Sequence, residues 1–198
     1  MKIKENELCR CPWVDLSKED YVKYHDEEWG VPVHDDRKIF EFLTLESAQA
    51  GLSWYTVLKK RQAYRKAFDN FEPEVVARYD SEKIESLMLD AGIIRNRMKI
   101  TASVNNAQIF LKIKEEFGSF AKYIWRFVEG KPIINYPKTI KDYPAVSKES
   151  DALSRDLKQR GFKFMGSTVC YAHMQATGMV NDHGIDCYRK TQIIDSHK

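Results

Sequence analysis

The sequence reads Leu87-Met88-Leu89-Asp90-Ala91-Gly92-Ile93-Ile94-Arg95-Asn96-Arg97 at the point that decides the fold. This stretch predicts a helix that ends in a glycine-containing turn, after which a second helix with basic residues begins at once. Gly92 tolerates positive φ angles, so we expect it to close the turn. The start of the second helix leaves backbone N–H groups unpaired, which suits a phosphate, and Arg95, Arg97 and Lys99 add positive charge there. The stretch therefore predicts a hairpin that binds a nucleic-acid backbone, although a purely structural turn would show the same pattern.

Helical periodicity extends outward from this hairpin in both directions. Apolar residues recur at helical spacing from Ile100 to Leu111, which predicts a long second helix. Further helices are expected within 17–29, 35–51 and 53–64, from Pro73, from Ser81, and within 117–128, 150–161 and 165–179. Residues 130–148 are proline-rich and predict an irregular connection, in which 131–136 is too short to seed a sheet. We expect an all-α fold in which residues 1–198 form a single domain of two closely packed helical lobes.

The composition narrows the class of protein. With 43% hydrophobic residues the chain is not disordered, and its 4 cysteines are too few for a small disulfide scaffold. The net charge of +3 hides an uneven distribution: residues 47–68 and 91–114 hold ten basic residues and no acid, whereas the rest holds 22 basic and 29 acidic residues. Clustered cations favour a polyanion through counterion release, although solvated helix faces would look the same.

No part of the sequence predicts a membrane or export route. The first ten residues are polar, and no run approaches the ~20 apolar residues that span a bilayer. We therefore expect a cytoplasmic protein without a membrane partner, whose thiols stay reduced. In that setting, cysteine and histidine residues near the two ends indicate metal ligands more than disulfides.

Four such residues could form one metal site. His183 and Cys187 are four residues apart, so a helical turn or a tight loop can direct both at one ion. Cys11 and His25 would complete a set of two thiolates and two imidazoles, which is a closed tetrahedral zinc site with no place for a catalytic water. We expect a structural Zn2+ that joins the N- and C-terminal segments, with Cys9 as a competing ligand.

A carboxylate and a group of aromatic residues indicate a pocket. Glu46 lies in an otherwise apolar helical stretch, where a buried carboxylate is costly unless it is paired or hydrogen-bonded. The floor of a pocket would explain this placement; an exposed helix face or a salt bridge is the alternative. The aromatic residues are Trp13, Tyr21, Tyr24, Trp29 and Trp54. They could stack on a planar ligand, at ~1–3 kcal/mol per base, or simply build the core.

A resemblance to a known family rests on Tyr24 to Pro32, Leu45 to Arg61, Ala91 to Arg97, and Arg160 to His183. These stretches are collinear and resemble 3-methyladenine DNA glycosylase I, a family of constitutive bacterial alkylation-repair enzymes, over about residues 9–187. The resemblance implies an all-α fold of the helix-hairpin-helix glycosylase superfamily with a zinc site. It also implies base excision repair: the enzyme flips 3-methyladenine out of alkylated double-stranded DNA and hydrolyses its glycosidic bond, leaving an abasic site. We expect a monomer without an organic cofactor.

The resemblance also assigns roles in the pocket. Glu46 would hydrogen-bond the excised base, Tyr24 would make a second polar contact, and Trp54 would stack on the base. Trp13 and Trp29 would be further aromatic residues of the pocket.

The zinc ligands implied by the resemblance are Cys11, His25, His183 and Cys187. Cys11 precedes Pro12-Trp13 as the family ligand precedes its tryptophan, whereas Cys9 falls outside the family pattern. The resemblance therefore favours Cys11 as the ligand, and Cys9 stays open as the alternative.

The chemistry of the implied substrate favours catalysis by binding. A base methylated at N3 of adenine is cationic and leaves readily, and an anionic Glu46 and the face of Trp54 would favour it over neutral adenine. Leu52, on the turn after the pocket helix, could fill the gap left by the flipped nucleotide. Superfamily relatives usually carry an aspartate on the helix past the hairpin, but the nearest acids here are Glu115 and Glu116. The alternative function is a zinc-stabilised helical module that detects lesions without cutting.

Overall fold

The protein is described here by a computed structural model that covers residues 8–196, and most of the polar N-terminal stretch lies outside this range. The first part of the chain forms α1 (Glu19–Glu27), α2 (Asp36–Gln49), α3 (Trp54–Leu58), α4 (Arg61–Ala67), α5 (Pro73–Val76) and α6 (Ser81–Leu89). The second part forms α7 (Arg97–Phe117), α8 (Phe120–Trp125), α9 (Lys148–Gln159), α10 (Ser167–Ala176) and α11 (Tyr188–Asp195). Short 3-10 turns are η2 (Asp69–Phe71), η3 (Arg126–Val128) and η4 (Ile140–Asp142). Two strands are present among the described residues: β1 (Ile133–Ile134) and β2 (Val180–Asn181).

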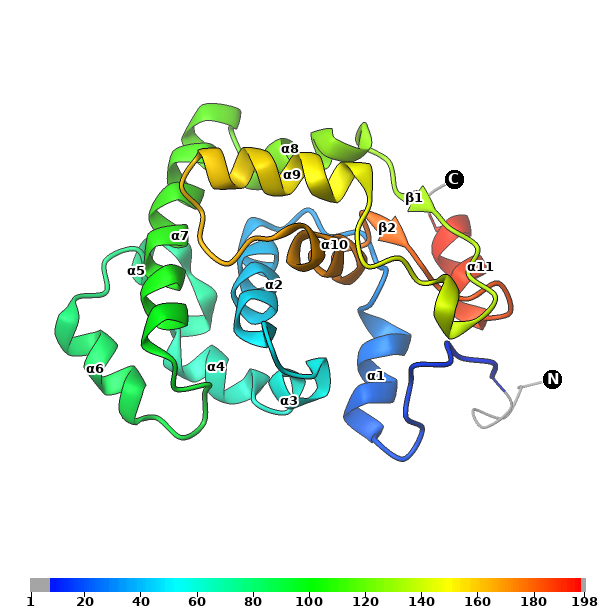
Figure 1. Ribbon diagram of the computed structural model, residues 1–198, viewed down its shortest axis with the longest axis horizontal. Coiled ribbons are helices and arrows are strands. Elements are labelled where there is room, and N and C mark those ends of the chain that lie inside the picture. The colour runs from blue at the N-terminus through cyan, green and yellow to red at the C-terminus, as the bar shows by residue number, and fades with distance from the viewer. Residues whose placement is uncertain (1–7, 197–198) are drawn as a thin grey trace.

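The fold is mostly helical, as the periodicity predicts. Figure 1 shows α2 and α10 in the middle of the molecule, with α4 to α7 on one side and α1, α11 and the strands on the other. The division into two lobes stays a prediction. No helix in the described part of the chain combines the length and apolar character needed to cross a membrane.

Helix α2 lies at the centre of the core because its sequence is apolar on nearly every face. Its residues from Ile39 to Ala48 are all buried, and the helix contacts α3, α7, α8 and α10. The ring of Phe110 on α7 lies between Phe40 of α2 and Phe120 of α8, with centroids 5.3 and 4.0 Å away. Asp35 caps the helix by accepting the N–H of Lys38. Packing on all sides fixes where the last turn of α2 points.

The connection between η3 and α9 is irregular, as its prolines predict, but it contains one short parallel pair. Ile133 pairs with Val180 and Ile134 with Asn181, so this connection is fastened to the segment that leads to His183. This strand pair was not expected from the sequence, because two residues are too few to show a strand pattern. Helix α11 was also not predicted, since Cys187 at its N-cap makes no side-chain capping bond.

Candidate active site and metal centre

The pocket expected around Glu46 exists as a cavity of about 270 Å³ between α1, α2, α10 and the η4 segment. Its walls are mostly aromatic and apolar. The lining residues are Trp13, Tyr21, Tyr24, Trp29, Glu46, Gln49, Trp54, Ile140, Tyr143, Pro144, Ala172 and Gln175. All five side chains predicted for base binding and catalysis therefore border one cavity, although they come from different segments between residues 13 and 54.

Glu46 lies in the last two turns of α2, with its side chain at the cavity and only 4% of its surface exposed. No hydrogen bond or ion pair joins its carboxyl group to a described residue, and burial is the only cause that shifts its pKa. Burial raises the pKa of Glu46 to about 8, so the pocket favours the neutral acid at neutral pH. We expected Glu46 to be an anion, but burial favours its protonated form. A cation beside the carboxyl group would favour the ionised form again.

The aromatic walls meet one another around the carboxyl group. Tyr24 and Trp54 lie 5.2 Å apart between ring centroids, and Trp13 and Trp29 lie 4.8 Å apart, edge to face. Burial holds the pKa of Tyr24 well above its usual value, so this phenol stays protonated and can donate. The indole N–H groups of Trp13 and Trp54 are buried and have no hydrogen-bond partner in the described structure. A planar ligand with polar edges suits such walls.

Two amide side chains that line the pocket, Gln49 and Gln175, were not predicted from the sequence. Gln49 lies three residues after Glu46 on α2, so helical spacing from the carboxylate could have indicated it. Gln175 comes from α10, and its amide nitrogen donates to the Asp182 carboxylate at 2.7 Å. No pattern in the sequence links Gln175 to Glu46, since only the packing of α10 on α2 brings them together.

The four predicted metal ligands, Cys11, His25, His183 and Cys187, form one buried cluster. Their ligand atoms all lie within 4.8 Å of one another. The Sγ atoms of Cys11 and Cys187 lie 3.4 and 3.3 Å from Nδ1 of His183, and Sγ of Cys187 lies 3.5 Å from Nε2 of His25. Neighbouring ligands of a tetrahedral zinc ion lie roughly 3.5 Å apart, given bonds of ~2.0–2.3 Å. The donor set and its spacing therefore fit a tetrahedral metal.

The surroundings of the cluster fix the orientation of its ligands. Nδ1 of His25 lies 2.7 Å from the Asp26 carboxylate, and Nε2 of His183 lies 2.9 Å from the carbonyl oxygen of Trp29. Each imidazole thus directs its other nitrogen at the cluster, which is the usual arrangement around a bound metal. Cys9 is exposed and lies outside the cluster, so the geometry favours Cys11 over its neighbour.

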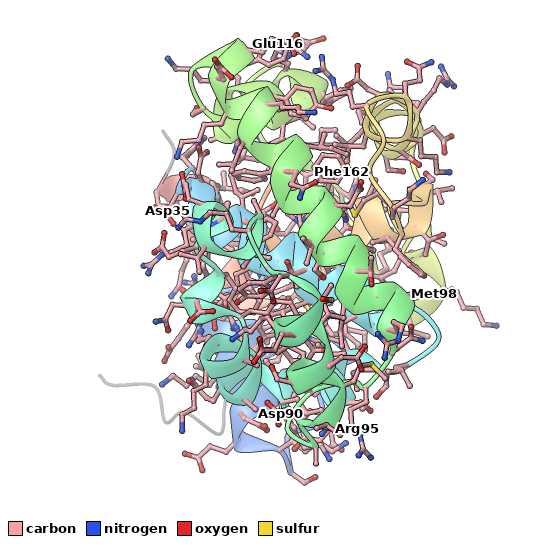
Figure 2. The ribbon with its side chains drawn as sticks, turned by 90° about the vertical axis from the view of Figure 1, so that its left-hand side faces the viewer. Asp35, Asp90, Arg95, Met98, Glu116 and Phe162 are labelled. Atoms are coloured by element: carbon pink, nitrogen blue, oxygen red, sulfur yellow. The ribbon has the colours of Figure 1, made fainter. Side chains whose placement is uncertain are left out.

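The hairpin forms between α6 and α7, but Gly92 does not have the positive φ that we expected. Close approach requires glycine there instead. A Cβ atom at Gly92 would lie 2.8 Å from Cβ of Ala63 and 2.9 Å from Oδ1 of Asp90. The Gly92 N–H donates to Asp90 Oδ1 at 2.7 Å, which holds the turn in place. Figure 2 shows the turn, with Asp90 and Arg95 labelled, at one end of α7.

The three basic residues of the hairpin differ in whether their charged groups face solvent, form an ion pair or point into the protein. Arg95 is exposed, without a hydrogen bond or ion pair to the described residues. Arg97 is exposed but forms a two-pronged ion pair with Glu85. The prediction for Lys99 is wrong: its ammonium group points into the protein, because two backbone carbonyls at the end of α2 accept from it.

The first basic window is also partly neutralised. Arg61 is buried and pairs with Glu28 and Glu41, and Arg65 pairs with the same Glu41 carboxylate. These two arginines join α4 to α2 and to the end of α1, so they contribute to the fold. The charge pattern of the sequence therefore overstated the positive charge that is free for a polyanion.

Leu52 lies on an exposed turn beside the pocket. Its side chain is 41% exposed, and it borders a second hollow of about 150 Å³ that Glu46 and Gln49 also line. Gly51, with a φ of +81°, supplies the left-handed residue that ends α2 and reverses the chain. Leu52 therefore presents an apolar side chain beside the pocket, and its role as a wedge stays a prediction.

The acids past the hairpin, Glu115 and Glu116, are not among the residues that line the pocket. Glu116 is near the C-terminal end of α7, some 30 Å along the 21-residue helix from the hairpin, and pairs with Arg160. Figure 2 shows Glu116 and Arg95 at opposite ends of the view. Among the described residues that line the pocket, Glu46 is the only carboxylate.

Known proteins resemble the chain over nearly its whole length. A family model described as methyladenine glycosylase matches residues 13–190. DNA-3-methyladenine glycosylase 1 of Escherichia coli is 48% identical over 178 residues, which are 90% of this chain and 95% of that protein. A crystal structure of 3-methyladenine DNA glycosylase I matches with a TM-score of 0.88 and 48% identity, covering 91% of this chain and 98% of the other. A Staphylococcus aureus structure described as showing the basis of 3-methyladenine recognition matches with a TM-score of 0.88 and 41% identity, covering 91% and 96%. The chain therefore belongs to the methyladenine glycosylase family.

Proposed function

We propose that this chain excises 3-methyladenine from alkylated double-stranded DNA by hydrolysis of the glycosidic bond and leaves an abasic site. The observation that carries the proposal is the buried, unpaired carboxyl group of Glu46 at the floor of an aromatic pocket. A protein that only binds DNA has no use for such a group, because a buried carboxyl group without a partner lowers the stability of the fold. The names of the relatives, which are 3-methyladenine DNA glycosylases, support the same reaction.

Recognition follows from charge and shape. The flipped base enters between aromatic rings, where Trp54 offers its face and Tyr24 a phenol that stays protonated. Because the N3-methylated base is cationic, its arrival favours ionisation of Glu46, whose acid form is otherwise favoured by burial. Normal adenine is neutral and would leave Glu46 protonated, so the pocket selects the alkylated base by charge.

The bond-breaking step needs little help from the protein. As the bond between C1′ of the sugar and the base breaks, its electron pair stays on the base, which becomes neutral. Water then adds to C1′ of the oxocarbenium-like sugar and releases its proton to solvent. The described lining residues offer no second carboxylate as a general base. We infer that binding of the flipped nucleotide supplies most of the catalysis.

The hairpin and the Leu52 turn are the features that support DNA binding. We propose that the start of α7 binds a phosphate through the N–H groups that Asn96 does not cap, with the exposed Arg95 beside it and the tightly packed Gly92 turn holding it in place. Arg97 would have to leave Glu85 to take part. Leu52 would fill the space left by the flipped nucleotide.

The Cys11, His25, His183 and Cys187 cluster would hold one Zn2+ in a structural role. Four protein donors leave no position for a reacting water, so the metal would supply stability and no catalytic chemistry. The pocket, the hairpin and the Leu52 turn all belong to one chain, so a monomer would suffice for the proposed reaction.

The test is to incubate the protein with DNA treated with a methylating agent and to analyse the released bases by chromatography. The proposal predicts free 3-methyladenine and heat-labile abasic sites. DNA binding without any released base would instead support a lesion-detecting module.

A further inference from the structure

Helix α2 ends without a positive charge of its own to satisfy its last carbonyl groups. The C-terminal carbonyls of a helix point away from any intrahelical donor and carry partial negative charge. The last turn of α2 contains no basic residue; Ala48 is buried there, whereas Ala50 just beyond it is exposed. The positive charge at this end of the helix comes from elsewhere in the chain, because Lys99 donates to it.

Lys99 reaches this site from the start of α7. Asn96 caps α7 by accepting the Lys99 N–H at 3.2 Å, so the residue sits in the first turn after the hairpin. Its ammonium group donates to the carbonyl oxygens of Ala48 at 2.8 Å and Ala50 at 2.7 Å. Only 9% of the residue is exposed. Lys99 thus bridges the hairpin helix and the end of the pocket helix with two charge-assisted hydrogen bonds.

The two carbonyls belong to the segment that carries the functional side chains. Ala48 and Ala50 follow Glu46 within one turn, and Leu52 comes two residues later. The Leu52 N–H donates to the carbonyl of Gln49 at 2.6 Å, so the exposed turn is tied to the part of α2 that Lys99 holds. In Figure 1 the end of α2, the start of α3 and the loop between α6 and α7 lie on the same side of the molecule.

We propose that Lys99 is a positioning residue that couples the hairpin to the base pocket. It sets the end of α2 and the Leu52 turn relative to the hairpin, so that seating the hairpin on the DNA backbone places Leu52 and Glu46 at the flipped nucleotide. This role rests on the proposed excision of a base from DNA. It differs from a phosphate contact, which the basic sequence around Lys99 would suggest.

The two roles differ in salt dependence. A lysine that neutralises a phosphate releases a counterion, so its removal lowers the slope of log affinity against log salt by about 0.9. An internal lysine leaves that slope unchanged. The test compares Lys99→Met with Arg95→Met, whose side chain is exposed at the same hairpin. Lys99→Arg serves as the conservative variant, since a guanidinium can also donate to two carbonyls.

Three quantities are measured for each variant: duplex affinity over a range of salt, single-turnover release of 3-methyladenine from duplex DNA, and affinity for the free base. We expect Lys99→Met to lower the release rate roughly tenfold or more, with free-base affinity within about twofold of the wild type and an unchanged salt slope. Lys99→Arg should recover most of the rate. Arg95→Met should lower the salt slope by about 0.9.

Three results would overturn the proposal: release from Lys99→Met at the wild-type rate, a salt slope that falls as it does for Arg95→Met, or a free-base affinity that falls as far as the release rate. Thermal melting identifies a variant that does not fold, in which case Lys99→Arg and Lys99→Gln are compared in its place.

If the wild type released no base, the proposed function would fail. Duplex affinity and its salt slope would then still decide the role of Lys99, because an internal tie must weaken binding without changing the slope.

Discussion

The ring of Trp13 meets the ring of His25 edge-on, with 5.3 Å between the two centroids. A second contact of the same kind joins Trp29 to His183, at 4.7 Å. In both pairs a wall of the pocket contacts a residue of the buried cluster of Cys11, His25, His183 and Cys187. The cluster therefore does more than join two ends of the chain, since its ligands also support the aromatic side of the pocket.

Loss of one metal ligand is accordingly expected to weaken base binding. Cys187→Ala removes a thiolate from the cluster and should abolish the proposed metal binding, because a structural zinc site uses four protein donors. We expect free-base affinity to fall roughly tenfold, together with a lower melting temperature. Metal content is measured by elemental analysis and base affinity by calorimetry.

Cys9→Ala is the matched control, because Cys9 is exposed and outside the cluster. It should keep the metal and the affinity of the wild type. Loss of metal from the Cys9 variant, or full base affinity in a metal-free Cys187 variant, would contradict this account.

Burial of Glu46 predicts a specific dependence of stability on pH. The pKa of Glu46 rises from 4.5 to about 8 on folding, so the folded chain keeps a proton that the unfolded chain has lost in this window. The free energy of unfolding therefore falls as pH rises from ~4.5 to ~8, by up to about 1.4 kcal/mol per pH unit from this group. Glu46→Gln carries no charge at any pH. It should match the wild type near pH ~4.5 and exceed its stability by a few kcal/mol above pH ~8.

Urea unfolding of the wild type and of Glu46→Gln between pH ~4.5 and ~8 measures the difference in their free energies of unfolding. The contributions of the other titrating groups are the same in both proteins and cancel in this difference. A gap between the two proteins that stays constant with pH would show that Glu46 is not buried as an acid.

The tight approach at Gly92 predicts that the hairpin tolerates no larger residue. In Gly92→Ala the new Cβ would lie 2.8 Å from Cβ of Ala63, so the turn must shift, at a cost of about 1–3 kcal/mol. We expect weaker binding to duplex DNA with unchanged affinity for the free base. Gly166→Ala is the control, since a Cβ there meets nothing within 4 Å and φ is −70°. Equal losses of DNA binding in the two variants would argue against a role of the hairpin.

The exposed turn at Leu52 predicts a difference between two substrates. A wedge matters when a nucleotide leaves a paired stack, and it matters little when the base is already unpaired. Leu52→Ala should slow release from duplex DNA by roughly tenfold and have a much smaller effect on single-stranded DNA. The same factor on both substrates would mean that Leu52 acts on the pocket itself.

Parts of the site were open to sequence analysis because local spacing carried the information. His183 and Cys187 are four residues apart, and Glu46 interrupts an apolar helix. Each pattern is short and physically unusual, so it predicts a role without knowledge of the fold. The resemblance to a family then placed these patterns in one pocket and one cluster.

Other parts depend on packing that no local pattern encodes. Lys99 looks like a surface cation in the sequence, but the end of α2 lies close enough to turn it inward. Gly92 looks like a left-handed turn residue, whereas the neighbouring Ala63 on α4 is what excludes a side chain. Gln175 enters the pocket only because α10 packs on α2.

The most direct test of the central claim is single-turnover release of free 3-methyladenine from alkylated duplex DNA by the wild type and by Glu46→Gln. We expect the wild type to release the base, and we expect the variant, which cannot form the anion, to release it at least roughly tenfold more slowly while binding the duplex normally. Equal rates for the two proteins, or a wild type that binds the DNA and releases nothing, would contradict it.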